Sequence, residues 1–180
     1  MTETLPGYEI NPYTMLLRPA GEELTEVIEA KARYLVSRKP FDIVKKSCDY
    51  FGSSYNGRRE GTKQLIGVTH KAPIIVDPYT SIYLFPTASP SSPDCMWISH
   101  DYIAAFEKND ACSTMITFQN HERLEIPISF YSFEKQVSRT ARLRVKFTQN
   151  VKKMETFHKH PIQFPRNWAS EHHGSYWIDE

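Results

Sequence analysis

The stretch FGSSYNGRREGTKQLIGVTHKAPIIVDPYTSIYLFPT, residues 51–87, contains the densest local signal in the chain. Ser53 or Ser54 can cap a helix, because a serine hydroxyl accepts a hydrogen bond from one of the first unpaired N–H groups of a helix. Leu65 and Ile66 supply the buried end of that helix. The stretch therefore predicts a short helix, followed by strands.

Two glycines inside this helix, Gly57 and Gly61, are four residues apart and so lie on one face. Glycine in a helix interior costs about 1 kcal/mol against alanine, so the pair indicates a close approach, either to another helix or to a ligand. Arg58, Arg59 and Lys63 stand beside these bare positions. A phosphate backbone would suit a surface that combines close approach with positive charge.

The composition fits one globular domain, or one domain and a tail, because the chain has 180 residues of which 40% are hydrophobic. No segment approaches the roughly 20 apolar residues that span a bilayer, and the N-terminus lacks the pattern of a signal peptide. We expect a soluble, cytoplasmic protein without membrane contact. Cysteines without paired spacing predict reduced thiols rather than a disulfide framework; they are Cys48, Cys95 and Cys112.

The formal net charge of +1 argues against an obviously basic nucleic-acid-binding protein. The distribution of charge is uneven, however. Residues 1–30 hold one Lys or Arg against six Asp or Glu, a net −5; residues 31–150 hold 17 against 11, a net +6; and residues 151–180 hold four of each. An acidic segment ahead of a basic centre can moderate non-specific phosphate binding, although a plain solvated segment explains it equally well.

The N-terminal third predicts strands followed by a helix. Residues 8–18 predict a strand, a turn at Asn11-Pro12 and a second strand. Residues 26–38 alternate apolar and polar side chains with the period of a half-buried strand, and a helix is the alternative. Pro40 then begins a helix that Gly52 ends. The buried stripe of this helix is Phe41, Val44, Cys48 and Phe51.

Further strands follow the helix of the opening stretch. Residues 74–76 and 82–85 predict a pair of strands around a turn at Asp77-Pro78. The proline-rich loop 86–93 is too short to be a flexible linker between domains. Later strands are predicted at 96–100, 114–118 and 124–128, the last after a turn at 120–121. We therefore predict an α+β fold with a mainly antiparallel sheet and a few helices, including a long basic helix near the C-terminal third.

That basic helix is predicted from Tyr131 to about Asn150, beginning near Ser132. At about 100° per residue, its cations fall within about 60° of one another and span about 16 Å of the axis. They are Lys135, Arg139, Arg142 and Lys146, and the apolar residues of the opposite arc are Phe133, Val137, Ala141, Leu143, Val145 and Phe147. Arg144 falls on the apolar side without a counterion that the sequence identifies. The cationic stripe either binds an anionic partner or is a solvated face.

Neither catalysis nor metal binding finds support in the sequence. The cap serines, His70 and Asp77 could supply a nucleophile, a base and an acid, but the chain has no Gly-x-Ser-x-Gly elbow and no Gly-Lys-Ser/Thr end of a phosphate-binding loop. Cys95 and His100 lack the second pair of ligands that a structural zinc site needs. We predict a protein that is not an enzyme and holds neither metal nor cofactor.

Several long motifs together resemble the ComK competence transcription factor family. The resemblance runs from about Tyr8 to about Lys146. Its motifs are FGSSY-x-GR-x-x-GT at 51–62, HKAPIIVDP at 70–78, FPT at 85–87, CMWISH at 95–100, LEIPISF at 124–130 and SFEKQVSRTARLRVKF at 132–147. It implies a bacterial, sequence-specific activator of DNA-uptake genes that recognises paired A/T-rich boxes, largely through the minor groove, as an oligomer.

The implied function suggests roles for the cations. The width and negative potential of an A/T-rich minor groove favour inserted Arg and Lys. We expect the first set to enter or line that groove, with Gly57 and Gly61 permitting close approach; this set is Arg58, Arg59 and Lys63. The second set would clamp phosphates, which fixes position without reading bases; it comprises His70, Lys71, Lys135, Arg139, Arg142 and Lys146.

Residues 1–150 are thus predicted to form a DNA-binding domain, and residues 151–180 an extended or partly disordered tail that matches no family motif. In the family this end is associated with activation, for which RNA polymerase is the expected partner, and with docking of a Clp-protease adaptor. Residues 157–165 are aromatic and proline-bearing, which suits a docking peptide.

Two alternatives stay open at this point. The chain could be a paralogue that binds DNA without activating transcription, or a protein-interaction module whose basic stripe meets an acidic partner. Self-association as a dimer or tetramer rests on the resemblance, because the sequence shows no heptad seam.

Overall fold

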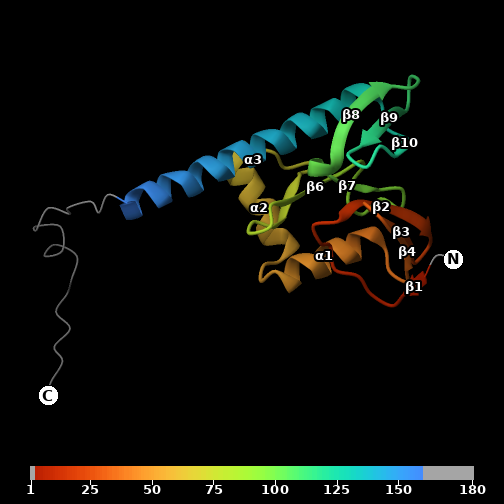
Figure 1. The fold of residues 1–180 in the computed structure, drawn as a ribbon, viewed down its shortest axis with the longest axis horizontal. Coiled ribbons are helices and arrows are strands. Elements are labelled where there is room, and N and C mark those ends of the chain that lie inside the picture. Colours follow the sequence, from red (N-terminus) through yellow and green to blue (C-terminus); the bar gives the residue numbers. More distant parts are fainter. Residues whose placement is uncertain (1–2, 160–180) are drawn as a thin grey trace, which may run out of the picture. The chain divides into compact units, whose positions relative to one another are not determined.

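A seven-stranded sheet, ordered β1-β4-β3-β2-β7-β6-β5, forms the centre of the fold, and a three-stranded sheet, ordered β10-β9-β8, lies against it (Figure 1). The structure is a computed structural model that describes residues 3–159. Every pairing in this range is antiparallel except that of β1 with β4. The predicted α+β class with mainly antiparallel strands is confirmed.

The strands and helices have the following bounds. The large sheet contains β1 (Glu3–Leu5), β2 (Thr14–Gly21), β3 (Leu24–Glu29), β4 (Arg33–Val36), β5 (Ile74–Asp77), β6 (Ile82–Pro86) and β7 (Trp97–Ser99), and the small sheet contains β8 (Ile103–Lys108), β9 (Thr114–Phe118) and β10 (Arg123–Ile126). The helices are α1 (Pro40–Tyr50), α2 (Tyr55–Ile66) and α3 (Phe130–Lys159), with a short 3-10 turn at His100–Tyr102.

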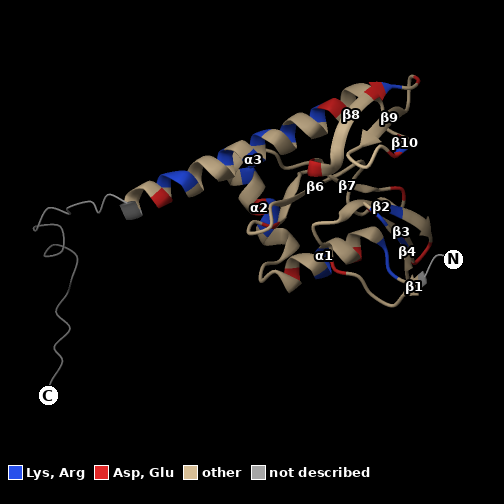
Figure 2. Ribbon diagram, viewed as in Figure 1, with Lys and Arg blue, Asp and Glu red and all other residues tan. Residues whose placement is uncertain are grey.

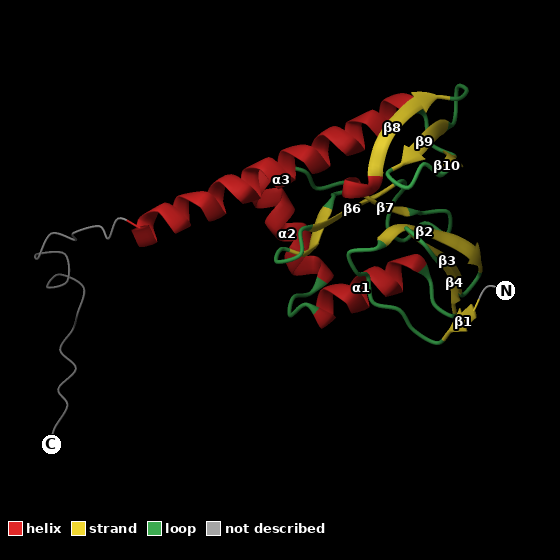
Figure 3. Ribbon diagram, in the orientation of Figure 1, coloured by secondary structure: helices red, strands yellow, loops and turns green. Residues whose placement is uncertain are grey.

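Both faces of the large sheet are covered (Figure 3). The side chains of its central strands alternate between two apolar clusters. One cluster holds side chains of α1 and α2 together with Leu17, Val27, Leu84 and Trp97. The other holds side chains of the small sheet and of α3 together with Leu16, Ile28, Phe85 and Ile98. Because both faces are buried, each of these strands has two neighbouring apolar residues, one for each face, instead of an apolar and a polar side.

The segment before β2 departs from the prediction, because only the second of the two strands expected in residues 8–18 forms. Side-chain hydrogen bonds hold the first part in place of a strand ladder. The Ile10 N–H donates to the Ser47 hydroxyl at 2.9 Å, and the Tyr13 N–H donates to the Asn11 side chain at 2.8 Å. These contacts satisfy the backbone locally, so no partner strand is needed.

Residues 26–38 are extended, so the helix alternative is wrong, but they form parts of two strands and not one. The chain reverses after β3, where the Glu29 N–H donates to the Ala32 carbonyl at 2.9 Å. Val27 then pairs with Tyr34 across the hairpin. No glycine, proline or asparagine marks this turn in the sequence, which is why the alternation appeared unbroken.

Helices α1 and α2 begin and end where the sequence predicted. Pro40 opens α1, and Gly52 lies just beyond its end with a φ of 76°. Of the two candidate serines, Ser54 caps α2 by accepting a hydrogen bond from the Gly57 N–H at 3.0 Å. Gly67 ends α2 with a φ of 72°, in the left-handed region that glycine adopts without strain.

The small sheet contains one strand that the sequence did not reveal. The predicted strands at 114–118 and 124–128 correspond to β9 and, shifted towards the N-terminus, β10, and the strand at 96–100 shortens to β7. The missed strand is β8, which pairs with β9 and is irregular between Ile103 and Ala105. Its side chains are half-buried or exposed, so it lacks the apolar alternation that marks a strand.

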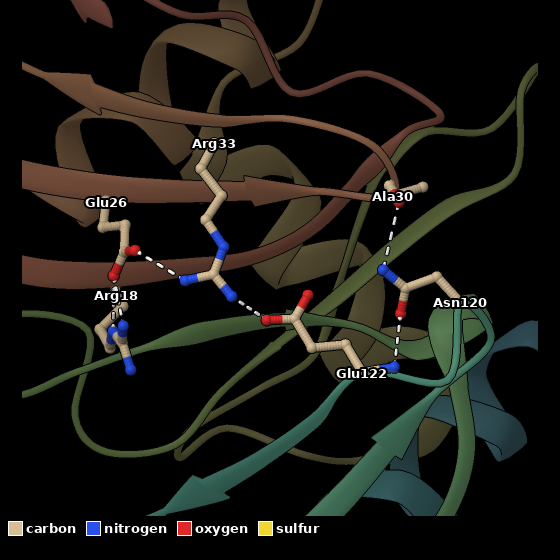
Figure 4. Close-up of polar contacts among 6 residues, drawn as sticks. All are labelled: Arg18, Glu26, Ala30, Arg33, Asn120 and Glu122. Carbon is tan, nitrogen blue, oxygen red and sulfur yellow. Dashed lines mark hydrogen bonds and ion pairs between the residues drawn. The ribbon is translucent and has the colours of Figure 1, made fainter. Parts of the chain in front are cut away.

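A polar network connects the outer part of the large sheet to the β9–β10 turn (Figure 4). Arg33 pairs with Glu122 of this turn and, at 3.3 Å, with Glu26, which also accepts from Arg18 at 2.9 Å. The Asn120 amide donates to the Ala30 carbonyl at 3.2 Å. Arg18 and Arg33 are thereby paired with carboxylates of the protein itself, which leaves them poorly suited to bind an external anion.

Helix α3 is longer than predicted, running from Phe130 to Lys159 instead of from about 132 to 150. Phe133 and Leu143 are fully buried as expected, but Val145 is 55% exposed and does not belong to the apolar arc. Arg144 finds a partner after all: its Nη2 donates to Asp101 at 2.6 Å, and its guanidinium lies over the Tyr83 ring, 5.0 Å from the centroid. The sequence could not show this counterion, because it comes from the turn before β8.

The chain divides into two units, residues 1–147 and residues 148–180. The described part of the second unit, from Thr148 to Lys159, is helical, and its side chains are exposed up to Phe157. The docking peptide predicted at 157–165 lies outside the described residues except for its helical start. The predicted division of the chain at residue 150 stays a prediction.

Candidate nucleic-acid interface

Two neighbouring pockets open between α2, the loop that follows it and the first turns of α3. The larger has a volume of about 320 Å³ and the smaller about 180 Å³. Lys71 lines both, so the pockets meet at this residue, and we call the combined surface the basic groove. Among the described residues no Asp or Glu lines it, whereas its basic side chains are Arg59, His70, Lys71, Lys135 and Arg139.

The larger pocket, here the α2 pocket, takes its charge from the α2 helix and from the loop that follows. Arg59 comes from α2, and His70 and Lys71 come from the loop; all three are exposed. The polar lining also includes the Asn56 amide and the hydroxyl groups of Thr69 and of two serines of the 86–93 loop. Cations and hydroxyls are the donors that proteins use to hold phosphate oxygens.

The smaller pocket, here the α3 pocket, is lined by the first turns of α3 together with Lys71. Lys135 and Arg139 are four residues apart and therefore share one face of the helix. Tyr131, one turn earlier, lines the same pocket and is 71% exposed. The sequence reasoning missed Tyr131, because an aromatic residue in a helix that packs on a sheet is normally a core residue.

Arg58 lies away from the basic groove, although it neighbours Arg59 in the sequence. It is half-buried and lines neither pocket. Burial raises the pKa of Asp77, but hydrogen bonds from Thr80 and Tyr79 together with the Arg58 charge lower it below its ordinary value. Successive residues of a helix point about 100° apart, which separates the two arginines.

Lys63 and the two helical glycines also lie outside the groove lining. Lys63 is paired with Glu60, one turn away, at 3.2 Å. Among the described residues, a Cβ atom on Gly61 would meet no other atom within 4 Å, and one on Gly57 would meet only the cap serines, at 3.2 Å and 3.3 Å. The alternative that these glycines permit tight packing on another helix is therefore wrong. Close approach to DNA stays a prediction.

The outer half of the predicted α3 stripe has a different environment from the inner half. Arg142 donates to the Ile66 carbonyl at 2.6 Å. This carbonyl lies at the C-terminal end of α2, where the helix dipole favours a cation. Lys146, one turn further on, is exposed and lines neither pocket. Figure 2 shows Lys and Arg on α2 and along α3, but only the first turns of α3 reach the groove.

Two of the residues considered for other chemistry, Ser54 and Asp77, have structural tasks. Ser54 caps α2, and the Asp77 carboxylate accepts from the Tyr79 and Thr80 N–H groups at 3.1 Å and 2.9 Å, which holds the β5–β6 turn. Within residues 3–159 no three His, Cys, Asp or Glu side chains gather as a metal site. None of the described helices is long and apolar enough to span a membrane.

The fold and the groove describe an α+β protein with a cationic surface and, in its described part, no assembled catalytic centre. The chain belongs to the ComK family, because the family model of the ComK protein matches residues 6–152. A relative described as the competence transcription factor of Bacillus subtilis (strain 168) is 43% identical over 150 residues, which cover 82% of this chain and 78% of the relative. No solved structure matches the chain.

The family resemblance drawn from the sequence motifs is thereby confirmed. The ComK family consists of transcription factors and not of enzymes, so the prediction of a non-enzymatic protein is also confirmed. Homology of this kind supports a transcriptional regulator of competence.

Proposed function

We propose that the protein regulates transcription of competence genes by binding A/T-rich double-stranded DNA through the basic groove. The observation that carries the proposal is the convergence of five basic side chains, from α2, the following loop and α3, on one surface that no described carboxylate lines. Such a surface attracts the phosphate backbone, which supplies most of the affinity of proteins for DNA. Membership of a transcription factor family makes DNA the partner of choice.

Recognition through the minor groove gives the two pockets separate tasks. Arg59 and Lys71 are the candidates to enter or line the narrow groove, where A/T-rich sequence enhances the negative potential. Lys135 and Arg139 lie on the rigid α3 helix and would hold the flanking phosphates. Tyr131, exposed beside them, offers an aromatic surface to a sugar or an unstacked base edge.

The remaining parts of the proposal rest on the family resemblance. They are recognition of paired A/T boxes, assembly as a dimer or tetramer, association with the nucleoid in the cytoplasm, activation through RNA polymerase and control by a Clp-protease adaptor. The segment expected to dock the adaptor lies almost wholly outside the described residues, so no contact of the structure bears on it.

The decisive experiment is fluorescence anisotropy of the purified protein with a duplex that carries two A/T boxes, compared with a duplex in which G·C pairs replace the boxes. Titrations at several salt concentrations give the number of phosphate contacts. Four Lys and Arg side chains in the groove predict a log–log slope of about −3.6 for each bound protomer, because each neutralised phosphate contributes about −0.9.

Preference for the A/T duplex with a slope near this value would support the proposal. Equal, weak binding to both duplexes would overturn it, and would favour the alternative in which the basic surface meets an acidic protein partner. A preference for A/T boxes with no activation of a reporter gene would instead identify a paralogue that binds without activating.

A further inference from the structure

A single buried amide connects the elements that form the basic groove. Gln136 lies on α3 and is only 3% exposed. Its Nε2 donates to the Lys71 carbonyl at 2.9 Å and to the Pro86 carbonyl at 2.7 Å, while its Oε1 accepts from Arg139 at 3.3 Å. Both donor hydrogens of the side chain are used, so Gln136 makes nearly the full set of bonds that a glutamine can make.

The backbone that this amide holds is in an uncommon conformation. Lys71 has a φ of 48°, in the left-handed region that residues other than glycine seldom adopt. Such strain persists only where the surroundings impose it, and it gathers at functional sites. On one side of Lys71 the Arg139 guanidinium approaches the His70 carbonyl at 3.5 Å, and on the other side Ala72 is buried.

We propose that Gln136 is a positioning residue for DNA binding, which holds Lys71 in place so that the basic groove exists before DNA arrives. The inference rests on the proposed function and adds a buried residue at the wall of the α3 pocket that acts through Lys71. Lys71 is exposed and is the residue at which the two pockets meet, so a shift of its backbone would alter both. A preformed groove avoids the cost of ordering its side chains during binding.

A purely structural role would give a different result from a positioning role. If Gln136 only stabilises the packing of α3, its loss should lower the stability of the protein and leave the contacts of Lys71 with DNA unchanged. If it positions Lys71, its loss should remove the same contact that the loss of Lys71 removes. A double-mutant cycle separates these cases, because residues that act through one contact are not additive.

The cycle uses Gln136→Met, which keeps the size of the side chain but removes its hydrogen bonds, together with Lys71→Ala and the double variant. The matched control is Thr140→Val. Thr140 is the next buried polar residue on the same face of α3. Within residues 3–159 its hydroxyl bonds only to the Gln136 carbonyl of the same helix, at 2.8 Å. Gln136→Glu is a second test variant, since it removes the two donors and keeps the acceptor for Arg139.

We expect Gln136→Met and Lys71→Ala each to weaken binding to the A/T duplex about tenfold, the effect of losing one good contact, and to lower the salt slope by about 0.9. In the Lys71→Ala background, Gln136→Met should add no more than about twofold. Thr140→Val should change neither affinity nor slope. Additive effects, or an unchanged salt slope in a folded Gln136→Met or Gln136→Glu protein, would overturn the proposal.

A measurement without DNA keeps the test independent of the proposed function. Amide hydrogen exchange of residues 68–73 in the free protein should be faster in Gln136→Met and Gln136→Glu than in Thr140→Val, because the loop loses its attachment to α3. Equal exchange in these variants would refute the positioning role. If the wild-type protein binds no DNA but the loop exchange responds, the proposed function fails while the attachment of the loop by Gln136 stands.

Discussion

Lys135 and Lys146 allow the groove to be tested against the simpler idea of a cationic stripe. Both lie on the predicted stripe of α3 and both are exposed, but only Lys135 lines a pocket. The stripe hypothesis from the sequence predicts equal roles in DNA binding. The groove predicts that Lys135→Gln weakens binding, whereas Lys146→Gln, the matched control with the same change of charge on the same helix, does not.

The magnitude follows from the release of counterions. Each phosphate contact contributes about −0.9 to the slope of log K against log salt, so one contact accounts for about a 3.5-fold change in affinity between 50 and 200 mM salt. The wild-type protein and Lys146→Gln should lose affinity in parallel over this range. Lys135→Gln should lose about 3.5-fold less, with a slope smaller by about 0.9.

The assay is fluorescence anisotropy with the A/T duplex at four or more salt concentrations, with circular dichroism to confirm that both variants are folded. Neither lysine forms an ion pair within the described residues, so neither substitution breaks an ion pair of the protein itself. The change in the salt slope then reports the loss of a contact with DNA. Equal reductions of the slope by both substitutions would refute the groove and favour the stripe.

Three further predictions concern folding and reactivity. Asp77→Asn should lower the free energy of unfolding, measured by urea titration, by about 1–2 kcal/mol at pH 7. Because the pKa of Asp77 is depressed in the folded state, the difference between the variant and the wild-type protein should fade below about pH 4. Gly61→Ala should raise that free energy by up to about 1 kcal/mol, and a loss of DNA affinity in this stabilised variant would indicate close approach. Exposed Cys112 should react with a thiol reagent in the native protein. Cys48 and Cys95 are buried and should react only on unfolding, and burial also raises the pKa of Cys48 to about 11.

Local chemistry explains the elements that the sequence predicted well. Ser54 caps α2, Pro40 opens α1 and Gly52 follows its end, because caps, proline and glycine act through the backbone of their immediate neighbours. The failures have the opposite character. The β3–β4 turn has no turn residue, and β8 is a strand only because β9 lies beside it. Local sequence therefore contains no pattern that predicts this turn or this strand.

The candidate site likewise has features that local sequence predicts and features that depend on distant partners. The sequence alone determined the family, the α+β class, the cationic residues of α2 and α3 and the turn residues that separate the elements, because each depends on residue identity and short spacing. Only the tertiary structure decided which cations share a surface. Arg59 and Lys71 line the α2 pocket, and Lys71 and Lys135 line the α3 pocket. Arg58 lines neither pocket, and Arg142 is held at the end of α2. These partners lie far apart in the chain, and the packing of α3 and α2 on the sheet alone brings them together.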